Sequence, residues 1–242
     1  MLPFHPRPMR VALQASFAAT LLAAIDSTGV AEPPRDASTA SLACAATTVI
    51  VRSAEAGDAE DLCRGAAAAT VFFRALGRST DTPLALDVVE QLPLDVDRRA
   101  VGCFSRRNLR AYVLTYAAFG SRQTWLGLPV SRELYTSVGA HEVAHALTAC
   151  TAAAHPLSVQ ATEYIASVVM FGTMHTPSRD AVLALYPEAD FASDWDITDV
   201  AYGLDPVRFG VGAYRHFLRE PDPASFLRSV LDGGVLGERF HY

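Results

Sequence analysis

The residues His141, Glu142 and His145 form the pattern H-E-x-x-H within the apolar run 139–147. This run contains alanine, leucine and valine but no proline, a composition that favours a helix, and residues four apart on a helix are neighbours on one face. Two imidazoles at this spacing can bind one ion, usually Zn²⁺, and the glutamate beside the first histidine can serve as a general base for water at that ion. We therefore expect the chain to fold around a zinc-binding helix.

A third ligand is expected because catalytic zinc sites usually have three protein ligands and one position for water. Glu163 follows His145 by 18 residues and lies in a second apolar run, 157–171, that also favours a helix. A short break at 151–156 separates the two runs, so the two helices are expected to pack antiparallel with Glu163 facing the histidine pair. The predicted zinc ligands are therefore His141, His145 and Glu163.

Residues 131–175 resemble the gluzincins, the thermolysin-like metallopeptidases, in which H-E-x-x-H is followed on the next helix by a ligand glutamate. The resemblance implies the same three ligands, Glu142 as the catalytic base, and an N-terminal half built on a small sheet. The spacing to Glu163 is at the short end of the family's range. Ser167 stands where thermolysin has an aspartate that orients a ligand histidine, so this outer partner must come from elsewhere in the chain.

A zinc peptidase also needs a second donor for the oxyanion that forms when water attacks a carbonyl. In gluzincins this donor is a tyrosine, histidine or arginine C-terminal to the ligands. Tyr202, Tyr214 and His216 lie in this part of the chain. We take Tyr214 and His216 as the catalytic candidates, with ordinary packing in a helix as the alternative for both.

The expected fold class is α+β, in a single zincin-like domain over residues 44–242. Residues 44–130 are expected to form a small sheet with one helix, and residues 131–242 a helical half that carries the predicted ligands. Alternating or β-branched runs predict strands, and longer apolar runs ended by glycine or begun by proline predict helices. The strands are predicted at 47–52, 84–90, 100–104 and 109–116, and the further helices at 59–76, 177–185, 206–219 and 223–231.

Two segments are predicted as loops. Residues 117–129 are interrupted by glycine and proline, and residues 190–199 carry four aspartates that we expect to face water. The alternatives for these aspartates are a calcium site or the missing partner of a ligand histidine, although the segment has no D-x-D-x-D-G loop.

The N-terminus has the features of a secretory signal over residues 1–31. Arg7 and Arg10 precede an apolar stretch at 11–25, and small residues follow at 29–31. Residues 32–43 are predicted to be a flexible lead-in. The mature protein is therefore expected in the periplasm or outside the cell, without a membrane span once the signal is removed, and an uncleaved N-terminal anchor is the alternative.

The cysteines are Cys44, Cys63, Cys103 and Cys150. An even number in an exported chain predicts two disulfides, for which three connectivities are possible. Cysteine-bound zinc is the alternative, but Cys150 would face away from the histidine pair on their shared helix.

The formal net charge is −6 and every cationic side chain is an arginine, without a basic cluster that would indicate a nucleic-acid partner. The sequence therefore predicts an exported zinc-dependent hydrolase, a metallopeptidase whose substrate is a peptide or protein. The strand at 109–116 is the candidate edge for an extended substrate. The alternatives are a non-catalytic zinc-binding or structural protein of the same fold, and a hydrolase of another substrate class. The oligomeric state is not indicated.

Overall fold

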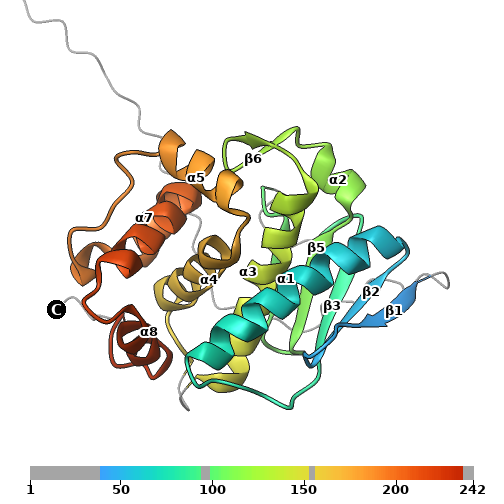
Figure 1. The fold of residues 1–242 in the computed structure, drawn as a ribbon, viewed down its shortest axis with the longest axis horizontal. Coiled ribbons are helices and arrows are strands. Elements are labelled where there is room, and N and C mark those ends of the chain that lie inside the picture. Colours follow the sequence, from blue (N-terminus) through green and yellow to red (C-terminus); the bar gives the residue numbers. More distant parts are fainter. Residues whose placement is uncertain (1–38, 94–98, 153–155, 237–242) are drawn as a thin grey trace, which may run out of the picture. The chain divides into compact units, whose positions relative to one another are not determined.

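A five-stranded mixed sheet forms the N-terminal half of the described chain (Figure 1). The computed structural model describes residues 39–93, 99–152 and 156–236. The strands lie in the order β1 (Ala40–Ala43), β2 (Val49–Ser53), β3 (Leu84–Val89), β5 (Arg110–Leu114) and β4 (Gly102–Ser105). The three inner strands are parallel, whereas the edge strands β1 and β4 each pair antiparallel with their neighbour.

Two helices that contact each other extensively pack against this sheet. Helix α1 (Ala56–Ala75) packs on β2, and helix α3 (Arg132–Thr151) packs on β5 and β4. The two helices approach closely because a glycine stands at the crossing in each. A Cβ atom on Gly65 would lie 2.2 Å from the Thr136 carbonyl oxygen, and one on Gly139 would lie 3.0 Å from Leu62 Cδ2. The crossing therefore fixes α3 at Gly139, two residues before His141, the first residue of the H-E-x-x-H pattern.

The helical half is built outward from α3 (Figure 1). Helix α4 (Val159–Thr173) packs on α3, helix α7 (Pro206–Arg219) packs on α4, and helix α8 (Pro223–Leu231) contacts both α4 and α7. Thr173 at the end of α4 shares a cleft with Glu133 in the first turn of α3. Helices α3 and α4 are therefore antiparallel, as predicted, and the expected α+β class is confirmed.

Helices α3, α4, α7 and α8 each begin directly after a residue whose side chain caps the start of the helix. The side chains of Ser131 and Ser158 accept hydrogen bonds from backbone N–H groups at the starts of α3 and α4. Asp205 and Asp222 do the same for α7 and α8, each of which begins with proline. The bounds of α7 and α8 are those predicted. Helix α5 (Thr176–Leu185) and helix α6 (Asp199–Leu204) complete the helical half.

Three expectations about loops and edges were wrong. Residues 40–43, assigned to the flexible lead-in, form strand β1, whose four residues are all exposed and so carry no alternating pattern. The segment 117–129 contains most of helix α2 (Tyr116–Gly120) and the hairpin of β6 (Thr124–Trp125) and β7 (Leu128–Pro129). Strand β5, the expected edge, lies between β3 and β4, so β4 is the edge on that side. The acidic segment contains the 3-10 helix η1 (Asp194–Asp196) and the start of α6.

The cysteines are only partly paired as expected. Cys44 and Cys63 form a disulfide that joins the end of β1 to α1. A second disulfide between Cys103 and Cys150 was expected in that case, and the structure does not form it. Gly102 on β4 faces α3, so its neighbour Cys103 points to the opposite side of the sheet from the helix that carries Cys150.

The predicted secretory signal lies outside the described residues, as does most of the lead-in. Among the helices that the structure describes, none is both long and apolar enough to cross a membrane.

Candidate metal centre

The two histidines of the H-E-x-x-H pattern lie one turn apart on α3 and turn the same ring nitrogen toward each other. Nε2 of His141 lies 3.1 Å from Nε2 of His145. Helix α3 is buried among the sheet, α1 and α4 along most of its length, and the two histidine side chains keep 20% and 11% of their surface exposed. Both imidazoles are therefore mostly buried but keep part of their surface exposed.

Helix α4 brings a carboxylate to this histidine pair. Glu163 lies in its second turn, with Oε2 3.7 Å from Nε2 of His141 and Oε1 3.5 Å from Nε2 of His145. The antiparallel packing of α3 and α4 brings Glu163 close to the two histidines. Helix α4 starts after its cap residue Ser158, five residues before Glu163. His141, His145 and Glu163, the three residues singled out by their spacing, thus form one cluster.

The donor set of this cluster fits a zinc ion. Ligand atoms about 2.0–2.1 Å from a tetrahedral Zn²⁺ lie about 3.3–3.4 Å from one another. The three separations in the cluster, 3.1, 3.5 and 3.7 Å, bracket that value. Two neutral imidazoles and one carboxylate are also a ligand combination found at catalytic zinc sites.

The protonation states favour a cation at the cluster. Burial lowers the pKa of His141 to about 4, and the Ala166 backbone, which lies near Nδ1 but short of a full hydrogen bond, opposes this shift. Burial also lowers the pKa of His145, with further contributions from His141 and Arg106. Both imidazoles are therefore neutral near pH 7, the form that binds metal ions. Nδ1 of His141 has no hydrogen-bond partner among the described residues, so neither Ala166 nor Ser167 fills the orienting role there.

Glu142 is buried on the side of α3 that faces the sheet. Only 5% of its surface is exposed, and its Oε2 atom has no hydrogen-bond partner among the described residues. Burial, and then the charge of Glu163, raise its pKa well above the usual value. Gly102 on the edge strand β4 lies directly against it, since a Cβ atom there would be 2.6 Å from Glu142 Oε1. The base predicted from the sequence therefore lies between the metal cluster and the edge of the sheet.

Tyr202 on helix α6 is the tyrosine that reaches the cluster. Burial raises the pKa of Glu163 to about 7, and a hydrogen bond from the Tyr202 side chain opposes this rise. The sequence shows only that Tyr202 lies C-terminal to the predicted ligands, as Tyr214 and His216 do. Its contact with Glu163 depends on how α6 packs on α4, which no local pattern indicates.

The two predicted oxyanion donors, Tyr214 and His216, lie outside the cluster of His141, His145 and Glu163. Tyr214 stacks on Phe171, with ring centroids 5.7 Å apart. Phe171 is eight residues beyond Glu163 on α4, about 12 Å along the helix axis at 1.5 Å per residue. His216 directs Nε2 toward Asp194 and Glu220, in a separate cluster. Both residues belong to the buried face of α7, because that helix packs on α4 away from the histidine pair.

Neither Ser167 nor a cleft at the other end of α4 contributes to the cluster of His141, His145 and Glu163. Ser167 is buried against α7, where a Cβ atom on Gly210 would lie 3.2 Å from the Ser167 hydroxyl oxygen. It therefore packs against a neighbouring helix and does not orient a ligand. A cleft of about 350 Å³ lies at the other end of α4, between Arg64, Arg132 and His175, and none of the three clustered residues lines it.

Comparison with known proteins gives one match. The model of a family described as "family of unknown function (DUF6639)" matches residues 49–240, which include strands β2 to β5, the histidine pair and Glu163. Among curated proteins no match was found, and among solved structures there was likewise none.

Proposed function

The chain belongs to a family of unknown function, DUF6639, and we propose that it is a zinc-dependent hydrolase that cleaves peptide bonds. The observation that carries this proposal is the cluster of His141, His145 and Glu163, whose donor atoms lie 3.1–3.7 Å apart. Zn²⁺ held there would lower the pKa of a bound water toward 7 and polarise a substrate carbonyl.

The proposed role of Glu142 is to move protons. Burial raises the pKa of its carboxyl group. A raised pKa is common in general bases that must later return the proton. It would take a proton from the attacking water and deliver it to the leaving amine. No other carboxylate is needed for this step, because Glu163 is occupied as a ligand and by its hydrogen bond from Tyr202.

The edge strand β4 is the proposed guide for the substrate. An extended peptide can add to a free sheet edge through backbone hydrogen bonds. Gly102 on β4 touches Glu142, so a peptide paired with this strand would pass close to the base. The mixed sheet, the antiparallel edge strand beside α3 and the ligand glutamate on the next helix together support a zincin-like fold as part of the proposal.

Export remains part of the proposal as well. The disulfide between Cys44 and Cys63 supports it, because structural disulfides persist in oxidising compartments such as the periplasm or the extracellular space. Residues 1–31 would then be removed as the signal.

A non-catalytic zinc-binding protein is the second candidate. No residue of the cluster lines the 350 Å³ cleft, so this cleft is not the substrate pocket that a peptidase reaction at the cluster would use. The two candidates differ in turnover and agree on metal binding.

The test is zinc content measured by elemental analysis together with cleavage of an unstructured polypeptide. Glu163→Ala should lose one equivalent of zinc, whereas His175→Ala, at the start of α5, should retain it. Zinc-loaded protein should cleave, chelation should stop cleavage, and added zinc should restore it. Unchanged zinc content in Glu163→Ala would refute the ligand set, and zinc binding without cleavage would favour the non-catalytic candidate.

A further inference from the structure

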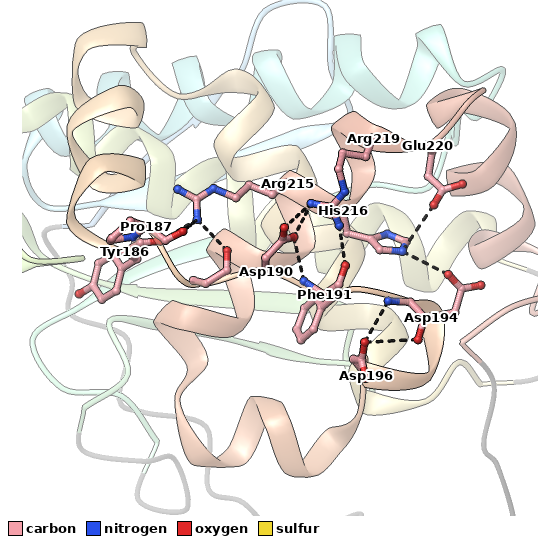
Figure 2. Close-up of polar contacts among 12 residues, drawn as sticks. Tyr186, Pro187, Asp190, Phe191, Asp194, Asp196, Arg215, His216, Arg219 and Glu220 are labelled. Carbon is pink, nitrogen blue, oxygen red and sulfur yellow. Dashed lines mark hydrogen bonds and ion pairs between the residues drawn. The ribbon is translucent and has the colours of Figure 1, made fainter.

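A second cluster of metal-ligating side chains lies at the junction of η1, α7 and α8 (Figure 2). His216, near the end of α7, points its ring between two carboxylates. Nε2 lies 3.2 Å from Asp194 Oδ1 and 3.4 Å from Glu220 Oε1. The three donor atoms come from two segments of the chain, because Asp194 belongs to η1, whereas His216 and Glu220 lie four residues apart at the end of α7.

The separations suit a shared ion better than direct ion pairs. A charge-assisted hydrogen bond from a ring N–H to a carboxylate is typically about 2.7–2.9 Å long. Donor atoms around a tetrahedral ion such as Zn²⁺ lie about 3.3–3.4 Å apart. Both measured distances, 3.2 and 3.4 Å, lie closer to the second value.

The histidine ring is held as a metal ligand requires. His216 is only 4% exposed, and its Nδ1 atom lies 3.0 Å from the hydroxyl of Tyr164. A ligating histidine usually directs its other ring nitrogen to a fixed polar partner, which sets the orientation and tautomer of the ring. The contact with Tyr164 leaves Nε2 as the ring nitrogen that faces the two carboxylates.

The charge of the cluster also calls for a cation. Asp194 and Glu220 bring two carboxylates to one imidazole, and the nearby arginines are engaged elsewhere (Figure 2). Arg219 binds Asp190 and the Phe191 carbonyl. Arg215 donates to four backbone carbonyls in the stretch 183–189. Among the described residues, neither carboxylate has an ion pair with an arginine.

We propose that Asp194, His216 and Glu220 form a second site for a divalent transition-metal ion of the zinc type. The nitrogen donor argues against Ca²⁺ and Mg²⁺, which take oxygen ligands. An ion here would tie η1 to the end of α7. Helix α6 begins three residues after η1 and carries Tyr202, which hydrogen-bonds Glu163, so the second ion would brace the segment beside the first cluster.

The test is a Zn²⁺ titration of metal-free protein by calorimetry in a His145→Ala background, where the first cluster is disabled. We expect one zinc ion per chain in this background. Glu220→Gln and Asp194→Asn, each added separately, should weaken this binding by more than about tenfold, the lower limit for losing even an outer partner of a ligand. Both positions are partly exposed, so these variants should fold where a His216 variant could fail.

The matched control is Asp196→Asn in the same background. Asp196 belongs to η1 but accepts hydrogen bonds from Ser193 and lies outside the cluster. It should leave zinc binding unchanged.

The absence of zinc binding in the His145→Ala background would overturn the proposal. Zinc binding that persists in Glu220→Gln and Asp194→Asn would overturn it too, because the ion would be elsewhere. If the first cluster does not bind zinc, the result is different. Wild type and His145→Ala would then each bind one zinc ion per chain, and Glu220→Gln would weaken that binding in both.

Discussion

Replacing Gly102 with alanine should impair catalysis without removing the metal. The new Cβ atom would lie 2.6 Å from Glu142 Oε1 and 2.7 Å from its Cγ, whereas ordinary contacts begin at 3.4 Å. The carboxylate must therefore move by about 0.8 Å, the difference between 3.4 and 2.6 Å. A misplacement of about 1 Å in a catalytic group can cost about 10²-fold in rate, so we expect a loss of this order in kcat.

The assay is the steady-state cleavage of an unstructured polypeptide, with zinc content measured on the same samples. Zinc should stay at the wild-type level, because Gly102 contacts the base and none of the three proposed ligands. Gly120→Ala is the matched control, since a Cβ atom there meets nothing within 4 Å. It should match wild type in both measurements.

A double variant separates an effect on Glu142 from a general loosening of the fold. If Gly102→Ala acts by displacing the base, adding it to Glu142→Gln should cause little further loss, because both changes remove the same function. Wild-type turnover in Gly102→Ala would refute the reasoning, and so would a full additional loss in the double variant.

Three further predictions concern stability and the support of the cluster. Asp58→Ala should lower the free energy of unfolding by about 1–3 kcal/mol in chemical denaturation, because it removes the buried carboxylate that accepts from the Tyr116 backbone N–H and pairs with the half-exposed Arg132; an unchanged midpoint would contradict this. Cys63→Ser should lower it by about 3 kcal/mol, from the disulfide's sequence separation of 19, whereas equal stability of reduced and oxidised protein would argue against the bond. Tyr202→Phe should weaken zinc binding by about 10–100-fold through the lost hydrogen bond to Glu163, and unaltered affinity would exclude that role.

Local signals predicted the elements that caps and periodicity define. Pro206 and Pro223, for example, predict the starts of α7 and α8. The cluster of His141, His145 and Glu163 could be predicted from the sequence. The i,i+4 spacing on one helix and the short break before the next helix leave few alternative positions for these residues.

Features that depend on non-local packing were not accessible from the sequence. The order of β5 and β4 is set by pairing between strands distant in the chain, and β1 pairs through its backbone alone. Tyr202, Tyr214 and His216 are equivalent by sequence position, and only the packing of α6 and α7 on α4 separates the residue at the metal cluster from the two that lie elsewhere.

Turnover by zinc-loaded wild type and Glu142→Gln, measured in parallel on an unstructured polypeptide, tests the central claim most directly. Glutamine keeps the shape of the side chain but cannot accept a proton. We predict zinc content equal to wild type and a fall in kcat of at least about 10²–10⁴-fold, the range typical of general acid–base catalysis. Equal turnover in the two proteins, or the absence of cleavage by the zinc-loaded wild type, would contradict the assignment of this chain as a zinc-dependent peptidase.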